Sequence, residues 1–352
     1  MKNNRRRFTA ACLAGFIGLF WLGLALAPAA EESSSPKSTD PFELNKRLGR
    51  GVNVLGYDPL WKARTKSRAR FRAEHFALIH EAGFNHVRIN LHPFRDADSK
   101  QSTTISDDYL RTLDWAVEQA LANKLMVILD FHEFEEMARD PAANKDRFLG
   151  IWRQIAEHCK NAPPDVLFEI LNEPNGKLTP ELWNQFLREA LGVIRESNPT
   201  RTVIVGPGEW NNIKQLEKLE LPDGDRNLIA TVHYYSPFEF THQGAAWTNR
   251  KDKLGVLWNG TEKEHEAVVR DFEKAQAWAA SHHRPLYLGE FGALEKGELA
   301  SRLRWISFVA RQAEKMGWSW AYWQFEGNFI VFDTANNRWI ESIRDALIPP
   351  SP

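Results

Sequence analysis

Cysteine is nearly absent from this sequence, since the chain contains only Cys12 and Cys159. Cys12 lies in an uncharged N-terminal run, so Cys159 is the only thiol in the remaining chain. A single thiol forms neither an intrachain disulfide nor a thiolate metal cluster. The domain must therefore be stabilised by a large core, which its 43% hydrophobic residues can supply.

An excess of charge of either sign is also lacking. The 45 basic and 46 acidic residues give a formal net charge of -1, and no basic block occurs after the N-terminus. A nucleic-acid partner is therefore not expected. Only 6 tyrosines are present, against 14 tryptophans. Indole rings stack on the C–H faces of sugars, although most of these tryptophans are expected to fill the core.

Residues 1–30 are typical of an export signal that is either cleaved or retained as a membrane anchor. Basic residues between Lys2 and Arg7 precede a run without charge from Phe8 to Ala30, and Ala27-Pro28-Ala29 offers a small-x-small cleavage site. The run reaches transmembrane length, so an anchor stays an alternative. We expect an exported protein, secreted or periplasmic, that contacts a membrane only if this leader is uncleaved. A polar linker over 31–41 then precedes a single domain over 42–350.

From Arg50 onward, short apolar runs alternate with amphipathic helical stretches. The expected strands are Val52–Leu55, His86–Asn90, Met126–Phe131, Val166–Leu171, Thr202–Val205, Leu228–Val232, Leu286–Leu288 and Ser319–Tyr322. The expected helices are Phe71–Ala82, Asp107–Asn123, Arg147–Lys160, Pro180–Ser197, Ile213–Leu219, Glu262–Ser281, Glu298–Lys315 and Trp339–Leu347. Such alternation implies parallel pairing, and eight units favour a single (β/α)8 TIM barrel. An open doubly wound sheet is disfavoured, because Gly51–Gly56 lacks a Gly-rich phosphate turn.

Polar and aromatic side chains follow seven of the eight expected strands. They are Arg88 and Asn90, His132, Asn172 and Glu173, Glu209 and Trp210, His233 and Tyr235, Glu290, and Trp323. Barrel enzymes build their active sites where the strands meet the following loops. The sequence therefore predicts an active site at this rim.

Two glutamates at strand ends indicate hydrolysis of a glycosidic bond, which requires one carboxyl to protonate the leaving oxygen and another to attack or activate water. The two are Glu173 and Glu290. Arg88 and Tyr235 are expected to donate to Glu290 and keep it ionised, as a nucleophile requires. His233 is expected near Glu173, where it would tune the protonation of that carboxyl.

Other residues are expected to bind the sugar. Asn172 is placed to bond a hydroxyl next to the cleaved linkage, and Trp323 to form a stacking floor. Glu209 also ends a strand and competes as an acid, but we assign it to binding. Further binding candidates are Trp210, Asn53, His92 and Trp247.

Each assignment has a structural alternative. Arg88 could pair with Glu169, a strand carboxylate that is costly to bury alone. His132 and His233 could be hydrogen-bonded core histidines, and Trp323 could be ordinary core. Three further acids compete for the catalytic roles but are expected in a solvated loop that enters a helix. They are Glu133, Glu135 and Glu136.

Eight of these residues match, in order, the motif set of glycoside hydrolase family 5, the cellulase family. They are Arg88, His132, Asn172, Glu173, His233, Tyr235, Glu290 and Trp323. The resemblance spans nearly the whole chain after residue 42. Within the family, Phe168–Pro174 and His233–Ala245 resemble bacterial endo-β-1,4-glucanases.

The resemblance implies retaining, endo-acting cleavage of β-1,4-linked glucans by double displacement, without cofactor or catalytic metal. It implies Glu173 as acid/base and Glu290 as nucleophile. Two departures leave the substrate open. His132-Glu133 stands where similar enzymes carry paired histidines, and the loops Tyr57–Trp61 and Leu91–Phe94 look unlike theirs. Mannan, glucomannan and mixed-linkage β-glucan therefore remain alternatives.

Two other functional classes are weaker interpretations. A non-catalytic carbohydrate-binding barrel would need neither acid. A zinc hydrolase would use His132, His233 and Glu290, but no His-x-His or His-Glu-x-x-His spacing supports it. We expect a monomer whose partner is a β-linked polysaccharide or oligosaccharide.

Overall fold

The computed structural model describes residues 40–54, 70–96 and 103–350. The expected leader, nearly all of the expected linker and the loop Tyr57–Trp61 lie outside these residues. Within the described residues, no helix combines the length and the apolar character that crossing a bilayer requires.

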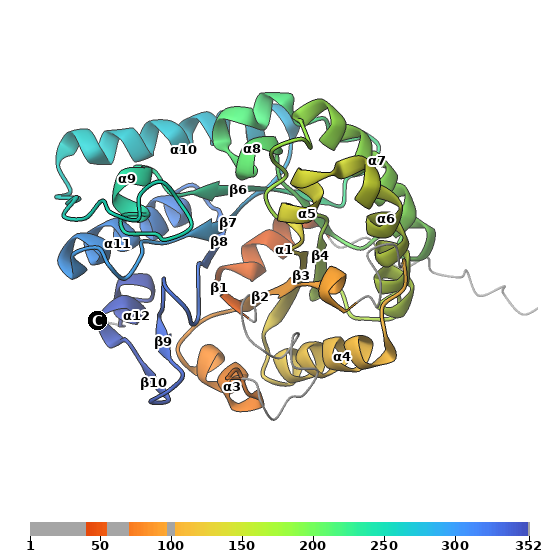
Figure 1. Ribbon diagram of the computed structural model, residues 1–352, viewed down its shortest axis with the longest axis horizontal. Helices are drawn as coiled ribbons and strands as arrows, with labels where there is room; N and C mark the ends of the chain where they lie inside the picture. The colour runs from red at the N-terminus through yellow and green to blue at the C-terminus, as the bar shows by residue number, and fades with distance from the viewer. Residues whose placement is uncertain (1–39, 55–69, 97–102, 351–352) are drawn as a thin grey trace, which may run out of the picture. The chain divides into compact units, whose positions relative to one another are not determined.

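Eight parallel strands close into a barrel (Figure 1). They are β1 (Arg50–Val54), β2 (His86–Leu91), β3 (Met126–Phe131), β4 (Val166–Glu169), β5 (Val203–Val205), β6 (Leu228–Tyr234), β7 (Leu286–Phe291) and β8 (Ser319–Tyr322). The strands follow one another in chain order, and pairing of β1 with β8, with Val52 opposite Tyr322, closes the barrel. The prediction of a (β/α)8 barrel is confirmed.

Helices surround the strands (Figure 1). The principal ones are α3 (Ala73–Glu81), α4 (Asp107–Ala122), α6 (Pro141–His158), α7 (Pro180–Ser197), α10 (Glu262–His282), α11 (Leu299–Lys315) and α12 (Glu341–Leu347). Several begin at side chains that accept bonds from otherwise free amides: Ser106 at α4, Thr179 at α7, and Thr261 with Glu264 at α10. The helix expected over Ile213–Leu219 is a 3-10 helix, η3 (Ile213–Lys218).

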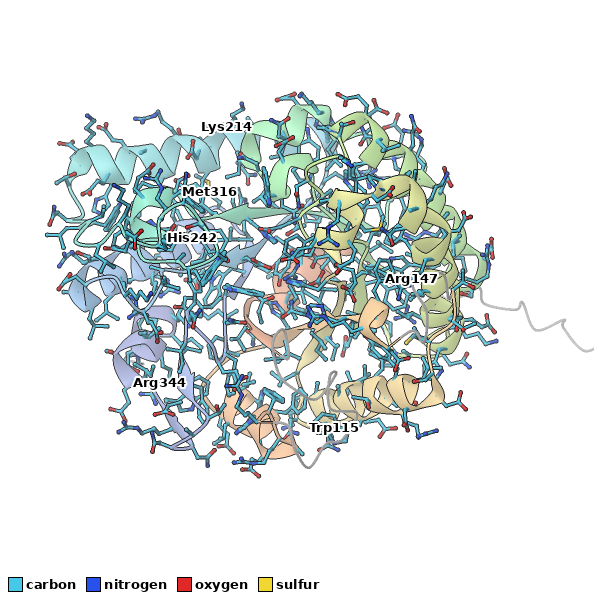
Figure 2. The ribbon with its side chains drawn as sticks, in the orientation of Figure 1. Trp115, Arg147, Lys214, His242, Met316 and Arg344 are labelled. Carbon is cyan, nitrogen blue, oxygen red and sulfur yellow. The ribbon has the colours of Figure 1, made fainter. Side chains whose placement is uncertain are left out.

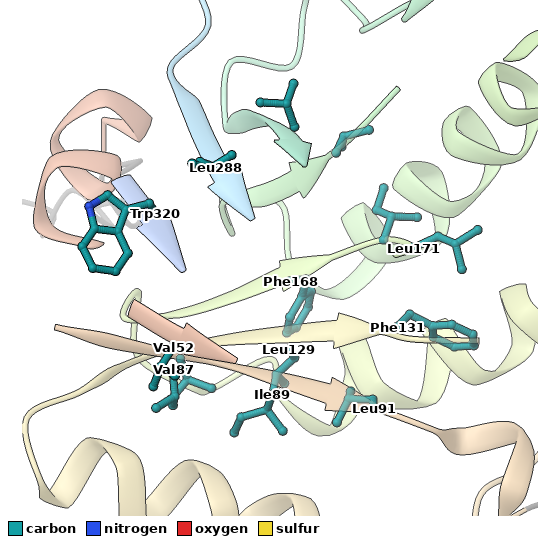
Figure 3. Packing of buried hydrophobic residues seen from close by; sticks show 14 of the residues in the cluster. Val52, Val87, Ile89, Leu91, Leu129, Phe131, Phe168, Leu171, Leu288 and Trp320 are labelled. Atoms are coloured by element: carbon teal, nitrogen blue, oxygen red, sulfur yellow. The ribbon is translucent and has the colours of Figure 1, made fainter. Parts of the chain in front are cut away.

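Alternate residues of each strand face the helices or the barrel interior. On the outer side, Val87, Ile89 and Leu129 belong to the main hydrophobic core between strands and helices (Figure 3). On the inner side, Ile128 belongs to a separate apolar cluster. Because Val87 and Ile89 face outward, Arg88 between them faces the interior.

A short helix, α1 (Pro41–Leu48), closes the N-terminal end of the barrel. Its Leu44 and Leu48 pack in the inner apolar cluster. Asn45 donates to the Leu286 carbonyl at 2.9 Å and accepts from Ser319 Oγ at 2.6 Å. This apolar floor leaves the C-terminal end of the barrel to polar groups. Other short elements that the sequence did not predict are η2 (Pro93–Arg95), α5 (Phe134–Arg139), α8 (Gly208–Asn211), α9 (Phe238–Thr241), β9 (Phe332–Asp333) and β10 (Arg338–Trp339).

Candidate active site

Arg88 is fully buried and connects several polar side chains at the C-terminal end of the barrel. Its Nε and Nη2 donate to the two oxygens of Glu169 at 2.7 and 2.8 Å. Nη2 also donates to Asn172 Oδ1 at 2.9 Å. Nη1 donates to Glu290 Oε1 at 2.9 Å and to Asn53 Oδ1 at 2.8 Å. Arg88 therefore pairs with Glu169 and donates to Glu290 at once, because a planar guanidinium donates in several directions.

Glu290 lies within β7, which runs further than the sequence indicates. Its second oxygen, Oε2, accepts from the Tyr235 hydroxyl at 3.0 Å. Burial raises the pKa of Glu290 to about 7; the neighbouring Glu173 acts in the same direction, while His233 and Arg88 oppose it. The donors at both oxygens stabilise the carboxylate form.

Glu173 lies on the loop after β4, in a left-handed backbone conformation with φ of 42°. Asn175 Nδ2 donates to the Glu173 carbonyl at 2.8 Å and stabilises the turn. Burial raises the pKa of Glu173 to about 8, against the opposing effect of Arg88 and with help from Asp130. The side chain remains 14% exposed. Glu173 therefore combines access from solvent with a proton that is retained at neutral pH.

His233 lies between the two carboxyls. Its Nδ1 is 2.7 Å from Glu173 Oε1 and 3.5 Å from Glu290 Oε2, and one atom of each group lies within 4.8 Å of the others. A β-bulge between Val232 and His233 shifts the register, so His233 pairs with Glu290 instead of Gly289. A Cβ atom on Gly289 would lie 2.9 Å from His233 Nε2. Glycine at this position therefore gives the ring its space.

His132 and Trp323 form a stacked pair at the same rim, with ring centroids 5.5 Å apart and planes 5° apart. Burial lowers the pKa of His132 well below its usual value, so the ring is neutral. Its Nδ1 donates to Asp130 Oδ2 at 2.6 Å. The same Asp130 oxygen lies 3.2 Å from Arg88 Nη2 and accepts from Asn90 Nδ2 at 3.0 Å. Asp130 thus links His132 to Arg88.

Aromatic rings lead outward from the carboxyl pair. The ring centroids of Tyr235 and His242 are 4.9 Å apart, and those of His242 and Trp247 are 6.5 Å apart. Figure 2 labels His242. Eight tryptophans are buried in the described residues, whereas Trp247 and Trp210 are 57% and 51% exposed. Glu209, beside Trp210, is half-buried. Trp210 and Trp247 are therefore available to stack on a ligand.

Two of the predicted binding residues, Asn53 and His92, are buried, and the prediction for Asn53 is corrected. Asn53 is fully buried; its Nδ2 donates to the carbonyls of Gly289 and Tyr322 at 3.1 and 3.3 Å. Its amide therefore supports the strands and has no free edge for a sugar. His92 is only 1% exposed and packs edge-on against His132 at 5.4 Å. It directly follows β2 at the same rim, and its contact with a sugar stays a prediction.

The expected solvated loop of acids also needs a correction. Glu135 is exposed and Glu136 is half-buried, but Glu133 is 1% exposed. Glu133 Oε1 accepts from the Phe94 amide at 2.8 Å, and Oε2 lies 3.8 Å from His92 Nδ1. Glu133 therefore joins the loops that follow β2 and β3.

Two buried polar residues of the site were missed from the sequence. Asp130 occupies an interior-facing position of β3, two residues after Ile128. A charged residue in an otherwise apolar strand was the signal that could have identified it. Asn211, which contacts His233, carries no such signal because a left-handed turn after β5 positions it.

Glu173, His233 and Glu290 are also spaced to offer three ligand atoms to a cation. Hydrogen bonds already occupy this set: His233 faces Glu173 at 2.7 Å and Arg88 donates to Glu290 at 2.9 Å. A cation would have to compete with the fixed positive charge of Arg88. The donor set therefore suits proton transfer better than metal binding.

The family model named Cellulase (glycosyl hydrolase family 5) matches residues 49–329. Endoglucanase H of Acetivibrio thermocellus is 32% identical over an alignment of 329 residues, which covers 90% of this chain and 35% of that protein. Endoglucanase 3 of Fibrobacter succinogenes is 28% identical over 350 residues, covering 86% of this chain and 53% of that protein. The chain thus spans about a third and about a half of the length of these relatives.

A solved structure of the endoglucanase Cel5A from Thermotoga maritima, in complex with cellobiose, is similar throughout the barrel. It superposes with a TM-score of 0.83 at 43% identity, covering 88% of this chain and 100% of that chain. The same enzyme in complex with a mannotriose substrate gives a TM-score of 0.83 at 42% identity, with the same coverage.

Proposed function

Because this chain belongs to the cellulase family, glycosyl hydrolase family 5, we propose that it is a glycoside hydrolase that cleaves β-1,4-linked glucans within the polymer chain. The observation that carries the proposal is the pair of buried carboxyls, Glu173 and Glu290, on either side of His233. A non-catalytic binding barrel would gain nothing from two acids whose burial costs free energy.

We propose a retaining mechanism. One oxygen of Glu173 and one of Glu290 lie within 4.8 Å of each other, which favours the separation of about 5 to 5.5 Å of retaining enzymes over the roughly 6.5 to 9.5 Å of inverting ones. In the first step, Glu290 attacks the anomeric carbon while Glu173 protonates the leaving oxygen. In the second, Glu173 takes a proton from water, and the water oxygen displaces Glu290.

The pKa values support this division of roles. Glu173, with a pKa of about 8, keeps its proton to higher pH than Glu290, with a pKa of about 7. An acid and a nucleophile in one site require this order. Arg88 and Tyr235 donate to Glu290 and favour its ionised form, while Trp323, stacked on His132 and 7% exposed, is proposed to contact the sugar through the surface that remains.

The exposed rings suit a polymer that extends beyond the cleaved bond. Trp210 and Trp247, and with them Glu209, are proposed to bind further sugar units. A mannan, glucomannan or mixed-linkage β-glucan is the alternative substrate, and one similar enzyme has been solved with both cellobiose and mannotriose. Similar endoglucanases often carry a histidine at the position of Glu133, which is buried here. This difference is a reason to test mannans as well as glucans.

Initial rates on carboxymethylcellulose, mixed-linkage β-glucan, glucomannan and galactomannan would test the proposal. We expect the highest rate on a β-1,4-glucan and a faster loss of viscosity than release of reducing ends. Proton NMR of the first product should show the β-anomer. No hydrolysis of any of the four polymers would refute the glycosidase assignment, and an α-anomer would refute the retaining mechanism.

We also propose that the protein is exported and acts on extracellular or periplasmic polymer. The support is the basic, then uncharged, N-terminal sequence over 1–30. Comparing the N-terminal residue of protein from the culture medium, periplasm and membrane fractions would separate a cleaved signal from a membrane anchor.

A further inference from the structure

The chain after β5 contains three consecutive residues with positive φ. The angles are 55° at Glu209, 61° at Trp210 and 53° at Asn211. Residues other than glycine adopt this region singly and at a cost, so a run of three persists only where its surroundings fix it. The Trp210 amide donates to the Pro174 carbonyl at 3.2 Å, and Asn212 forms a β-bridge with His233. The turn is thus attached both to the residue after Glu173 and to the strand of His233.

The turn directs the side chain of Asn211 into the barrel, where it is fully buried. Its Nδ2 lies 3.2 Å from His233 Nε2. Its Oδ1 lies against Gly206, where a Cβ atom would come within 2.0 Å, and has no hydrogen-bond partner among the described residues. Exchanging the two amide atoms would instead leave an NH2 group with two donors against Gly206. Since an unpaired buried donor is rarer than an unpaired carbonyl oxygen, the amide donates to His233.

This orientation determines which nitrogen of His233 carries the proton. If Nε2 accepts from Asn211, the neutral ring has its proton on Nδ1. Nδ1 then donates to Glu173 Oε1 at 2.7 Å, the shorter of its two carboxyl contacts. Burial lowers the pKa of His233 and keeps the ring neutral, against the opposing influence of Glu290. The other charged groups that face the ring are Arg88, Glu169 and Asp130.

We propose that Asn211 is a positioning residue that acts through His233 and fixes which oxygen of Glu173 transfers the proton. Oε1 of Glu173 already accepts a hydrogen bond from His233 Nδ1. The other oxygen, Oε2, therefore gives its proton to the glycosidic oxygen as the bond to the anomeric carbon breaks. Oε2 takes a proton back when water attacks in the second step. His233 keeps its proton throughout. The inference rests on the proposed glycosidase function for its kinetic consequences, but not for the state of His233.

The first test therefore does not depend on activity. In protein labelled with 15N-histidine, the ring nitrogens of His233, assigned by their loss in His233→Gln, should show a protonated Nδ1 and an unprotonated Nε2 at pH 7. In Asn211→Asp, the new carboxylate should draw a proton to Nε2, and both nitrogens should be protonated. A wild-type ring with its proton on Nε2 would overturn the proposal, even if the enzyme proved inactive.

The second test compares substrates that differ in their need for an acid. Cleavage of a dinitrophenyl β-cellobioside needs no protonation of its leaving group, whereas cleavage of cellotetraose does. Asn211→Leu should lower kcat/KM about tenfold or more on cellotetraose, a part of the 10²–10⁴-fold that general acid catalysis contributes, and change it little on the aryl glycoside. In Asn211→Asp, both limbs of the pH profile should shift to lower pH by about one unit, because a positively charged His233 ring favours the ionised forms of the neighbouring carboxyls.

The matched control is Asn212→Ser at the next residue, which is exposed and whose side chain caps η3. Serine keeps the cap, so the profile should stay as in the wild type. Equal losses on both substrates with unmoved pH limbs would reduce Asn211 to a structural role, and unchanged activity in Asn211→Leu would overturn the proposal. Wild-type protein that cleaves neither substrate would refute the proposed function instead, and the NMR result would still decide the inference.

Discussion

Arg88 Nη1 donates to Glu290 at 2.9 Å while the Nε edge of the same guanidinium is bound to Glu169 at 2.7 Å. The proposed nucleophile and a fully buried strand carboxylate therefore share one cation. Glu169 fixes the plane of the guanidinium, and that plane directs Nη1 at Glu290. The position of the nucleophile thus depends on a carboxylate that need not touch substrate.

We predict that Glu169→Gln destabilises the fold strongly. Arg88 would keep Asp130 and Glu290 as charged neighbours, but it would lose its bidentate partner and face an amide NH2 group in the interior. Breaking such a pair costs about 3–5 kcal/mol of unfolding free energy. Urea denaturation at pH 7 measures the change. The control is Glu196→Gln, whose pair with Arg153 is more than half exposed on both sides and screened by solvent, so this substitution should leave the free energy of unfolding nearly unchanged. Equal effects of the two substitutions would contradict the prediction.

We predict a bell-shaped dependence of kcat/KM on pH. Activity should rise as Glu290 loses its proton near pH 7 and fall as Glu173 loses its proton near pH 8. Glu173→Gln, assayed on an aryl glycoside that needs no acid, should lose the alkaline limb and keep the acid limb. An acid limb centred below pH 5 would show that the buried environment of Glu290 does not raise its pKa.

We predict that Glu290→Ala and Glu173→Ala each lower turnover by orders of magnitude, with a loss of about 10²–10⁴-fold for the acid/base alone. Azide should restore part of the activity in both variants, by attack on opposite faces of the sugar. Glu290→Ala should yield an α-glycosyl azide, and Glu173→Ala a β-glycosyl azide. Circular dichroism should show an intact barrel. The same anomer from both variants would argue against the assigned roles.

We predict that activity survives dialysis against a chelator, because hydrogen bonds from His233 and Arg88 occupy the set of groups that could bind a cation. Rates before and after dialysis against EDTA, and after adding Zn²⁺, measure this. Loss of activity that Zn²⁺ restores would support a metal-dependent hydrolase.

The rim of the barrel could be predicted from the sequence because parallel strands end on one side. A polar residue after each apolar run must then lie near the others, which is how Arg88, Glu173 and Glu290 could be placed together. Side chains also alternate between the two faces of a strand. Applied to β3, this alternation would have identified Asp130 as a charged residue facing the interior.

Other features depend on contacts that one sequence does not display. The β-bulge that pairs His233 with Glu290 requires the space left by Gly289, and a single glycine has many other possible reasons. Glu133 looks solvated in sequence because its neighbours are charged, yet the amide of Phe94 binds it in the interior. Asparagine can bind a sugar hydroxyl, but the side-chain amide of Asn53 is already hydrogen-bonded to groups on three neighbouring strands.

His86 lies at the end of the barrel opposite the active site and makes the stability of the fold depend on pH. It is fully buried between the Leu48 carbonyl, 2.7 Å from Nδ1, and the Tyr287 hydroxyl, 3.1 Å from Nε2. Burial lowers the pKa of His86 to about 4 from an ordinary value of 6.5, so the unfolded chain binds a proton that the folded chain does not. This contribution to stability is complete above pH 6.5 and is lost as the pH falls toward 4.

Between pH 7 and pH 5 this one group should lower the free energy of unfolding by about 2 kcal/mol. Urea denaturation of wild-type and His86→Gln protein at both pH values isolates the effect, since the variant cannot take up that proton. We expect His86→Gln to be less stable at pH 7, because it loses ring packing against Gly51, but to lose about 2 kcal/mol less on acidification. Parallel losses in the two proteins would assign the acid sensitivity to other groups, such as the carboxyls around Arg88.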